Sequence, residues 1–322
     1  MRILITGGAG FIGSNLAETL LQDKRVSHVR VFDNLATGSL INIESFRHHP
    51  KFEFREGDIR NYEACLAACD TIDLISHQAA LGSVPRSVAD PLTTNEVNIT
   101  GTLNIFTAAK EKKVKRIVYA ASSSTYGDHP GLPKIEDQIG KPLSPYAVTK
   151  YVNELYAQVY ASLYGVQFIG LRYFNIFGPR QNPQGAYAAV IPLFAKAILE
   201  NKPPVINGDG SHSRDFTFVD NAVQANILSL FTNDAGAVNQ VYNIACGHQT
   251  SLLALFNDLK KEAGSDLEPV HGPERTGDVK HSLADISKAK KMLGYNPSVS
   301  VEEGLKKTFH WYKEENVKSV RV

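Results

Sequence analysis

The sequence predicts an α/β protein built on a doubly wound parallel sheet, with a smaller, mainly C-terminal α/β region. Three observations predict this fold. Short apolar runs alternate with helical patterns through the first 175 residues. The first of these runs breaks at a glycine-rich turn that opens directly into a helix. After residue 175 the alternation becomes irregular, and loops rich in proline and glycine separate the helices.

The expected elements follow from these patterns in chain order. In the first part, strands are predicted at 2–6, 29–32, 52–54, 73–76, 116–121 and 167–172, and helices at 14–22, 91–112 and 147–164, the last started by Pro145. In the second part, helices are predicted near 188–200, 220–232, 251–263 and 301–315, with short strands near 204–206 and 241–244. We therefore expect two regions, 1–175 and 176–322, the second interleaved with the first.

The glycine-rich turn spans Gly7 to Gly13 and joins the first strand to the first helix. Gly7 and Gly10 let the backbone turn tightly and approach a pyrophosphate, and Gly13 lets the helix lie close to the sheet. The helix N-terminus offers unpaired N–H groups and a positive dipole end to phosphates. The spacing is Gly-x-x-Gly-x-x-Gly, unlike the Gly-x-Gly-x-x-Gly of the commonest dehydrogenases. The turn predicts a Rossmann-type dinucleotide-binding region over 1–175. The irregular part that follows, 176–322, is interpreted as the substrate-binding region.

Acidic residues after the second and third strands indicate which dinucleotide is bound. Asp33 follows Gly13 by 33 − 13 = 20 positions, where a carboxylate suits the two ribose hydroxyls of NAD and repels the 2′-phosphate of NADP. Asp58 is placed to accept a hydrogen bond from an adenine amino group. NAD is therefore the expected cofactor. His77 follows the fourth strand, and we interpret it as a packed loop histidine and not a catalytic one.

Tyr146 and Lys150 lie one turn apart on one face of the predicted helix. Free tyrosine titrates near about 10, and a neighbouring ammonium favours the phenolate, which would make Tyr146 a usable base. Ser122, Ser123 and Ser124 follow the fifth strand, at the edge where open α/β sheets bind ligands. On spacing alone, a Tyr–Lys pair is more often a surface pair and a Ser/Thr cluster is more often a simple turn. The dinucleotide-binding pattern that precedes them favours a functional site.

The composition limits the partners of the chain. It has 322 residues, with 34 Lys and Arg against 33 Asp and Glu, so a net charge of +1 gives no reason to expect nucleic acid or an anionic membrane. No apolar run approaches the roughly 18 residues of a membrane span. The cysteines, Cys65, Cys69 and Cys246, form an odd, sparse set typical of reduced thiols. We expect a cytoplasmic protein that binds neither nucleic acid, membrane nor metal.

Two loop arginines in the second region, Arg214 and Arg275, suit a diphosphate, because a guanidinium binds phosphate through two hydrogen bonds. Taken singly, either arginine is equally compatible with a surface salt bridge.

Taken in order, the glycine turn, the two aspartates and the Ser122, Tyr146 and Lys150 set resemble the extended short-chain dehydrogenase/reductase superfamily. The resemblance runs from Met1 to the Leu293-Gly294-Tyr295-x-Pro297 ending. Within the superfamily the chain is most similar to nucleotide-sugar 4-epimerases, on the segments Tyr173-Phe174-Asn175, Ser213-Arg214-Asp215-Phe216 and Arg275-Thr276-Gly277-Asp278. The stretch from Ser122 to Lys150, with Gly127-Asp128-His129-Pro130, especially resembles bacterial UDP-N-acetylglucosamine 4-epimerases.

This resemblance implies an isomerase of polysaccharide biosynthesis that interconverts UDP-GlcNAc and UDP-GalNAc through a 4-keto intermediate, by transient hydride transfer to tightly bound NAD. Tyr146 would take the proton of the sugar 4-hydroxyl, Lys150 would hold the nicotinamide ribose, and Ser122 would bridge O4 and Tyr146. In the family a bulky residue at the position of Ser282 closes the pocket around the sugar 2-substituent. Ser282 is small, which leaves room for an acetamido group. Turnover of UDP-Glc and UDP-Gal is left open.

The implied binding residues form two sets. The cofactor set is Gly7, Gly10, Phe11, Ile12, Gly13, Asp33, Asn34, Thr37, Gly38, Asp58, Ile59, Ala79, Ala80, Asn98, Tyr146, Lys150 and Tyr173. The UDP-sugar set is Ser83, Ser122, Ser123, Ser124, Asn175, Val190, Arg214, Arg275, Asp278 and Ser282.

Three alternatives are weighed against this interpretation. A UDP-glucuronate 4-epimerase is the closest rival and would need a cation near the sugar, a role left open for Arg86 and Lys196. A nucleotide-sugar 4,6-dehydratase is disfavoured, because Ser123 and Ser124 replace the Asp-Glu pair of those enzymes. A non-catalytic NAD(P)-sensing regulator, a protein of a different class, is disfavoured by the retained catalytic set.

Helices near 91–112 and 147–164 form a four-helix dimer interface in related proteins. The resemblance therefore implies a homodimer.

Overall fold

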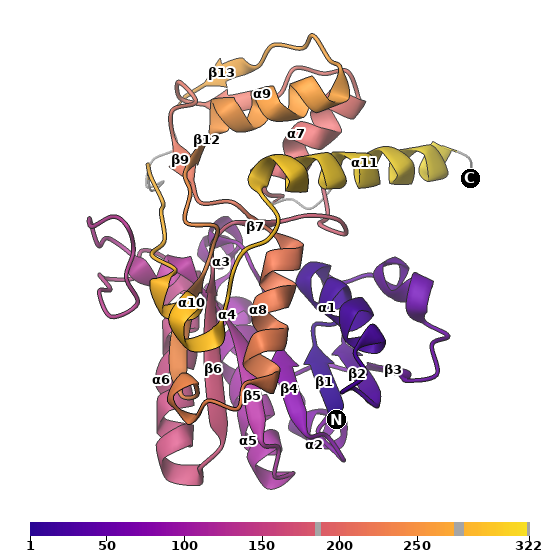
Figure 1. Cartoon of the computed structure of the whole chain (residues 1–322), viewed down its shortest axis with the longest axis vertical. Helices are drawn as coiled ribbons and strands as arrows, with labels where there is room; N and C mark the ends of the chain where they lie inside the picture. Colours follow the sequence, from indigo (N-terminus) through magenta and orange to yellow (C-terminus); the bar gives the residue numbers. More distant parts are fainter. Residues whose placement is uncertain (184–187, 274–279, 321–322) are drawn as a thin grey trace.

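The computed structural model describes residues 1–183, 188–273 and 280–320, with side chains of the last helix described as far as residue 315. Its centre is a seven-stranded sheet in the order β11-β6-β5-β4-β1-β2-β3, in which every neighbouring pair is parallel (Figure 1). The strands are β1 (Arg2–Thr6), β2 (His28–Asp33), β3 (Phe52–Glu56), β4 (Leu74–His77), β5 (Arg116–Ser122), β6 (Gln167–Tyr173) and β11 (Gln240–Ile244). This sheet confirms the predicted fold class. The strand order reverses between β1 and β4, which is where such sheets bind ligands.

Helices cover both faces of the sheet. One face carries α2 (Tyr62–Ala68), α5 (Thr102–Glu111) and α6 (Pro145–Tyr164), and the other carries α1 (Phe11–Gln22), α8 (Val219–Phe231) and α10 (Ser287–Leu293). Each face has its own apolar core. Because both faces are buried, the inner strands are largely hydrophobic runs, which is why the sequence reveals them, whereas residues of the edge strand β3 alternate between apolar and charged.

The C-terminal region lies beyond the carboxyl ends of the central strands (Figure 1). It contains α7 (Val190–Leu199), α9 (Leu252–Ala263) and α11 (Val301–Val320), with the short strands β7 (Ile176–Phe177), β8 (Val205–Asn207), β9 (Ser213–Arg214), β10 (Thr217–Phe218), β12 (Thr250–Ser251) and β13 (Val270–Gly272). However, α8 and β11 also come from beyond residue 175 and lie with the central sheet. The boundary at residue 175 stays a prediction.

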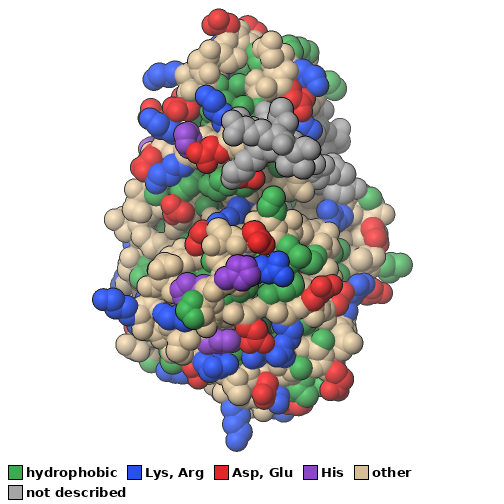
Figure 2. Space-filling model, turned by 90° about the vertical axis from the view of Figure 1, so that its right-hand side faces the viewer, with side chains coloured by type: hydrophobic (Ala, Val, Ile, Leu, Met, Phe, Trp, Pro, Cys, Tyr) green, Lys and Arg blue, Asp and Glu red, His purple; other side chains and the backbone are tan. Residues whose placement is uncertain are grey.

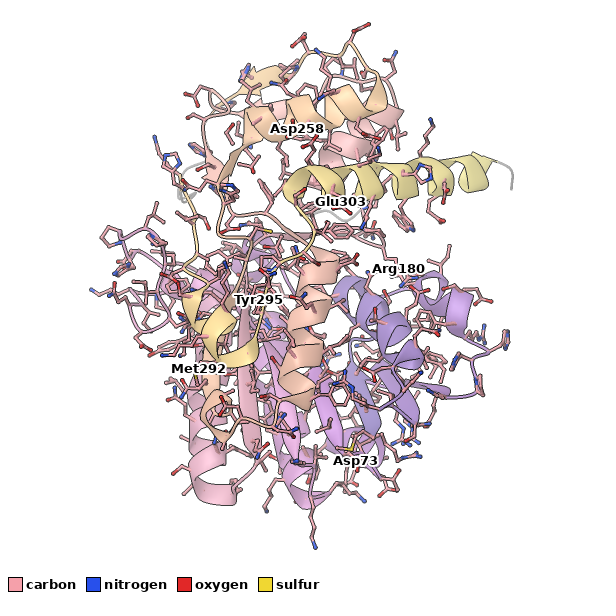
Figure 3. The ribbon with its side chains drawn as sticks, viewed as in Figure 1. Asp73, Arg180, Asp258, Met292, Tyr295 and Glu303 are labelled. Atoms are coloured by element: carbon pink, nitrogen blue, oxygen red, sulfur yellow. The ribbon has the colours of Figure 1, made fainter. Side chains whose placement is uncertain are left out.

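The C-terminal half also contacts the first helix, near Arg180 (labelled in Figure 3). The Arg180 guanidinium pairs with Glu18 of α1 at 2.6 Å, and the Asn15 amide of α1 donates to the Pro179 carbonyl at 3.1 Å. These contacts attach the segment after β7 to the helix that follows the glycine turn.

The helix α6, which carries the predicted catalytic pair, begins where Pro145 predicts. Ser144 is its N-cap, and the Ser144 hydroxyl accepts a hydrogen bond from the Ala147 N–H at 3.1 Å. The helix ends at Gly165, which adopts the left-handed conformation with φ +71°. Tyr146 therefore lies in the first turn, near the sheet edge where ligands bind, and Lys150 lies one turn further on.

The structure corrects several predicted boundaries. The helix predicted at 91–112 is three consecutive pieces: α4 (Pro91–Asn95), a π-helical turn η2 (Glu96–Gly101) and α5. Helix α1 starts at Phe11 instead of residue 14, because Gly10 of the turn is its N-cap. Helices α2, α3 (Val84–Ala89) and α10 are not predicted from the sequence, since helices of six or seven residues show too little periodicity. The 3₁₀ turns η1 (Leu40–Phe46), η3 (Ser123–Tyr126) and η4 (Ala235–Ala237) are not predicted either.

Acidic and basic side chains are interspersed on the face shown in Figure 2. Across the described ranges, no helix combines the length and apolarity that crossing a bilayer requires. The same ranges hold no cluster of three or more histidine, cysteine or acidic side chains arranged to bind a metal ion.

Candidate active site

A cavity of about 440 Å³ opens at the carboxyl ends of the central strands, where the strand order reverses. The predicted residues that line it are Gly7, Gly10, Phe11, Ile12, Gly13, Asp33, Asn34, Thr37, Asp58, Ile59, Ala79, Ala80, Ser122, Tyr146, Lys150, Tyr173 and Asn175. The cavity therefore joins the glycine turn, the second-strand carboxylate and the predicted catalytic residues in one site.

The glycine turn has the shape that a dinucleotide pyrophosphate requires. Gly7 has φ +67°, and a Cβ on it would lie 2.7 Å from the Ala79 nitrogen. A Cβ on Gly13 would lie 2.3 Å from the Gly7 carbonyl oxygen, so the close approach of helix and turn depends on that glycine. Gly10, the N-cap of α1, supplies no side chain to the first-turn amides. These residues therefore fit a diphosphate held at the N-terminus of α1.

Asp33 lies at the end of β2 and lines this cavity. The residue as a whole is 7% exposed. Its two oxygens accept backbone N–H bonds from Ala9 at 2.9 Å and Leu35 at 2.8 Å. Burial raises the pKa of Asp33, and the two backbone bonds oppose that shift. Each oxygen keeps a second lone pair, so the fixed carboxylate can accept from two ribose hydroxyls.

Asp58 is engaged in a way the sequence does not predict. Its carboxylate accepts from the Arg60 guanidinium at 2.8 Å and from the Asn34 amide at 2.9 Å. The Arg60 hydrogen bond is the main cause that lowers the pKa of Asp58 to about 2. Arg60 itself lines the cavity. The contact of Asp58 with adenine stays a prediction, and Arg60 shares that end of the site.

Ser122 connects the hydroxyl cluster to Tyr146. The Ser122 hydroxyl accepts from the Ser124 N–H at 3.1 Å and from the Ser124 hydroxyl at 2.9 Å. The neighbouring Ser122 hydroxyl also lowers the pKa of the Tyr146 phenol. The Lys150 ammonium lies 5.9 Å from the centre of the Tyr146 ring and donates to the Ala120 carbonyl at 2.8 Å.

The net electrostatic effect on Tyr146 is opposite to the predicted one. Burial raises the pKa of Tyr146 and outweighs the effect of the Ser122 hydroxyl. Burial also lowers the pKa of Lys150 to about 8. The spacing of the two residues predicts their proximity correctly, but it says nothing of the desolvation that both groups experience in the cavity wall.

His77 is packed, as expected, although it belongs to β4 and not to a loop. Its ring is 4% exposed and lies between the hydroxyls of Thr6 at 2.7 Å and Thr102 at 2.9 Å. Burial lowers the pKa of His77 to about 3, so the ring is neutral at physiological pH.

Two predicted cofactor residues are not among the described residues that line the cavity. Gly38 lies against the Ala9 backbone, where a Cβ would be 2.9 Å from the Ala9 carbonyl carbon. Asn98 is fully buried, and its amide accepts from the Leu81 N–H at 2.8 Å and donates to the Leu81 carbonyl at 3.1 Å. Because Leu81 lines the cavity, Asn98 supports the wall from behind.

Six predicted substrate residues also lie outside the cavity lining. Ser83 caps α3, Ser123 and Ser124 form the start of η3, and Val190 begins α7. Arg214 and Ser282 lie together, because Arg214 follows Ser213 in β9 and the Ser282 N–H donates to the Ser213 carbonyl at 3.1 Å. Arg275 and Asp278 fall outside the described residues.

Asp215, next to Arg214, is a supporting residue that sequence reasoning misses. Its carboxylate is fully buried and accepts backbone N–H bonds from Cys246 at 2.9 Å, Gly247 at 3.0 Å and Ala284 at 3.2 Å. Burial raises the pKa of Asp215 to about 6. These bonds hold the segments that carry Arg214 and Ser282 against each other.

Other lining residues were also missed: Phe32, Ala36, Gly57, Arg60, Gln78, Leu81, Gly82, Thr93, Val97, Ala120, Ala121 and Ile176. Most of them could have been predicted from the sequence, because they end a strand or directly follow one. Thr93 and Val97 come from α4 and η2, and no local pattern announces that those turns reach the cavity.

A doubly wound parallel sheet, a glycine turn shaped for a diphosphate, and a Ser-Tyr-Lys set in one cavity define a dinucleotide-dependent enzyme of the extended short-chain dehydrogenase/reductase type. The chain belongs to the NAD dependent epimerase/dehydratase family, which it matches over residues 3–245.

Similar proteins are nucleotide-sugar epimerases. The UDP-glucose 4-epimerase of Mycolicibacterium smegmatis is 37% identical, over 98% of this chain and 100% of its own length. The structure of the UDP-N-acetylglucosamine 4-epimerase of Methanobrevibacter ruminantium M1, in complex with UDP-N-acetylmuramic acid, is 38% identical with a TM-score of 0.92 over 98% of both chains. The UDP-glucuronic acid 4-epimerase of Bacillus cereus, in complex with UDP-glucuronic acid and NAD, is 34% identical with a TM-score of 0.90, over 98% of this chain and 100% of that one.

Proposed function

We propose that this protein is a UDP-N-acetylhexosamine 4-epimerase that interconverts UDP-GlcNAc and UDP-GalNAc. The observation that carries the choice of sugar is the small side chain of Ser282. Its backbone N–H is bound to the Ser213 carbonyl, beside Arg214, which is the residue proposed to hold the diphosphate. The likeness to the M. ruminantium UDP-N-acetylglucosamine 4-epimerase supports an acetylated substrate.

The proposed chemistry begins with proton transfer at the sugar 4-hydroxyl. Tyr146 takes this proton, and Ser122, whose hydroxyl lowers the pKa of Tyr146, holds the oxygen on which charge develops. Ser124 fixes the Ser122 hydroxyl by donating two hydrogen bonds to it, so the remaining Ser122 proton is left for Tyr146. When bound, NAD would supply the nicotinamide needed to take the hydride from sugar C4 and give it back. Arg214 anchors the diphosphate while the 4-keto sugar turns over to receive hydride on its other face.

The residues proposed to hold NAD are those that the cavity presents. Gly7, Gly10 and the first turn of α1 receive the pyrophosphate, and Asp33 accepts from the adenosine ribose. Lys150 is proposed to hold the nicotinamide ribose, since its ammonium has two donors left after the bond to the Ala120 carbonyl.

A product assay without added NAD tests the proposal. The purified protein is incubated separately with UDP-GlcNAc, UDP-GalNAc, UDP-Glc and UDP-glucuronate, and the products are separated by ion-pair chromatography. Interconversion of the acetylated pair is the expected result. Conversion of UDP-glucuronate alone would retain the hydride cycle and overturn the choice of sugar.

The variant Ser282→Tyr tests the pocket directly. A bulky residue there is expected to lower kcat/KM for UDP-GlcNAc at least tenfold while leaving that for UDP-Glc within about twofold, since a missing or added substituent in a pocket typically changes specificity 10–200-fold. Ser282→Ala, which keeps the side chain small, is the matched control. Undiminished activity of Ser282→Tyr on UDP-GlcNAc would show that position 282 does not control the sugar.

UDP-glucuronate epimerisation is the second candidate, favoured by the likeness to the B. cereus enzyme. Neither cation considered for the sugar carboxylate lines the described cavity. Lys196 of α7 lies 3.9 Å from Glu200 on the same helix, and Arg86 lies on α3. Ser282 and Arg214 lie outside the same lining, so the product assay, and not the cavity lining, decides between the two candidates.

We also propose that the protein is a homodimer. Exposed apolar side chains line one face of α6 at spacings of seven, four and four: Val148, Leu155, Val159 and Leu163. Leu92 of α4, a helix that packs against α6, is 77% exposed. A second copy would bury this apolar face. Light scattering should give twice the 35.3 kDa chain mass, and Leu163→Glu with Leu92→Glu should give the monomer; a monomeric wild type at micromolar concentration would exclude the dimer.

A further inference from the structure

Four polar side chains form a closed hydrogen-bond network under the cavity, where α8 packs along β4 and β6. Asn226 of α8 is fully buried and contacts Ser76, Gln78 and Tyr173. Gln78 and Tyr173 line the cavity, whereas Asn226 does not contribute to its described lining. Asn226 comes from beyond residue 175, and α8 lies alongside the sheet (Figure 1).

The direction of every bond in this network is fixed by one carbonyl. The Asn226 side chain lies 2.8 Å from the Ala222 carbonyl, which can only accept, so the amide nitrogen of Asn226 must be on that side. The Asn226 oxygen then accepts from the Ser76 hydroxyl and from the Gln78 amide, both at 3.1 Å. The side-chain orientation of Asn226 is therefore determined without any freedom to flip.

The same logic orients the two cavity residues. The Gln78 nitrogen faces the Asn226 oxygen, so the Gln78 oxygen faces the Tyr173 hydroxyl at 3.2 Å. The Asn226 nitrogen donates to the Tyr173 oxygen at 2.7 Å, and Tyr173 must donate its own proton to Gln78. The ring is thus one-way: Asn226 to Tyr173, Tyr173 to Gln78, and Gln78 back to Asn226.

This network lies between the two functional ends of the cavity. Tyr173 is paired with Ser122 in the register of β5 and β6, and both line the cavity together with Tyr146. On the other side, Gln78 precedes Ala79, whose backbone lies against Gly7 of the glycine turn. A shift of Gln78 or Tyr173 would therefore alter the cavity wall at both the catalytic hydroxyls and the glycine turn.

We infer that Asn226 is a positioning residue for the dinucleotide: through its three side-chain partners it fixes the orientation of Gln78 and Tyr173 in the cavity wall. A cofactor site built mainly by the N-terminal half would then depend on a side chain from the C-terminal half. The inference rests on the proposed placement of NAD in this cavity and does not depend on which sugar is the substrate.

Asn221 provides a matched control on the same helix. It is also fully buried and makes hydrogen bonds of similar length, to the Val299 carbonyl at 2.8 Å and from the Ser298 and Val299 N–H groups at 2.9 and 3.1 Å. These partners lie in the segment before α11, away from the cavity lining. Replacing either asparagine by leucine removes a comparable buried polar group, but only Asn226 contacts cavity residues.

The test measures how fast the purified holoenzyme exchanges its NAD for isotopically labelled NAD, a readout that needs no sugar. Losing a neutral hydrogen bond typically costs a factor of about three to ten, so Asn226→Leu and Tyr173→Phe should each release NAD about three- to tenfold faster. The double variant should be no faster than the faster single variant, because both changes break the same ring. Asn221→Leu should lose thermal stability and exchange NAD at the wild-type rate.

Two results would overturn the inference. One is NAD exchange at the wild-type rate in Asn226→Leu. The other is a double variant whose NAD exchange rate is raised by the product of the two single effects, because Asn226 would then not act through Tyr173. Should Asn226→Leu fail to fold, Asn226→Ala is judged by the same criteria. Tyr173→Phe, which removes one oxygen and no carbon, must in every case exchange faster than wild type for the inference to stand. Failure of the proposed function would appear separately, as normal NAD retention without conversion of any UDP-sugar.

Discussion

The buried ion pair between Arg172 and Glu154 joins β6 to α6, one residue before Tyr173. The guanidinium donates to the carboxylate twice, at 2.9 and 2.7 Å, and the two side chains are only 4% and 3% exposed. Arg172 also donates to the Glu136 carbonyl at 2.8 Å. Replacing Glu154 by leucine would leave the Arg172 guanidinium buried, with the Glu136 carbonyl as its remaining described hydrogen-bond acceptor.

Removing one partner of a buried pair typically costs about 3–5 kcal/mol, because the other charge stays buried without compensation. Unfolding entropy is about 2.1 cal/mol/K per residue, which for 322 residues gives roughly 0.7 kcal/mol/K. The melting temperature of Glu154→Leu should therefore fall by about 4–7 °C. Adding Arg172→Met should restore most of this loss, because no unpaired charge then remains in the core.

Urea denaturation and calorimetry, at a fixed NAD concentration, measure both quantities. The control is Glu303→Gln, whose partner Lys307 lies 2.9 Å away on α11 with both side chains about half exposed. Exposed pairs are worth about 0–1 kcal/mol, so that variant should melt within roughly 1.5 °C of wild type. The reasoning is refuted if Glu154→Leu loses less than about 1 kcal/mol, or if the double variant is no more stable than Glu154→Leu.

Three further predictions concern the catalytic residues and His77. Tyr146→Phe should lower turnover at least about 10²-fold while acid extraction still recovers bound NAD, since a general base typically contributes about 10²–10⁴-fold; near-normal turnover would exclude Tyr146 as the base. Ser122→Ala should move the limb of the kcat/KM pH profile that reports Tyr146 to higher pH, because the Ser122 hydroxyl lowers the pKa of Tyr146; an unmoved limb at reduced kcat would contradict this coupling. For His77 the pKa is about 3 in the folded chain and about 6.5 when unfolded, so the unfolded chain binds more protons in that window. As the pH drops below about 6.5, the free energy of unfolding of the wild type should therefore fall more steeply than that of His77→Gln, by about 1.4 kcal/mol per pH unit. Equal pH dependence of the two proteins in urea denaturation would refute the buried neutral ring.

The sequence predicts the parts of this fold that have a local cause. Five of the central strands, β1, β2, β4, β5 and β6, are almost entirely buried, so each is a largely apolar run that stands out from its surroundings. The glycine turn is equally local, because Gly7 and Gly13 are required by a positive φ and by a contact within seven residues. Short helices such as α2 and α10 have no such signal, and tertiary packing decides them.

Contacts between distant segments are the part that the sequence cannot supply. Asn226 and Gln78 are 148 positions apart, and Asp215 and Ala284 are 69 apart. Both contacts are made by buried polar groups whose partners are defined only when the sheet and its covering helix are assembled. The cavity lining was therefore predictable at strand ends, whereas the residues that fix the orientation of that lining were not.

Tyr146 shows how a correct local inference can still give the wrong net effect. The four-residue spacing places Lys150 near the phenol, and the ammonium is found 5.9 Å from its ring. The same burial that creates the site disfavours charge on both groups, so it raises the pKa of Tyr146 and lowers the pKa of Lys150 to about 8. Helix geometry sets the distance between the two side chains, whereas their pKa values also depend on how strongly the whole cavity wall desolvates them. Of the two causes that act on Tyr146, burial is the larger, and the Ser122 hydroxyl at the end of β5 opposes it by lowering the pKa.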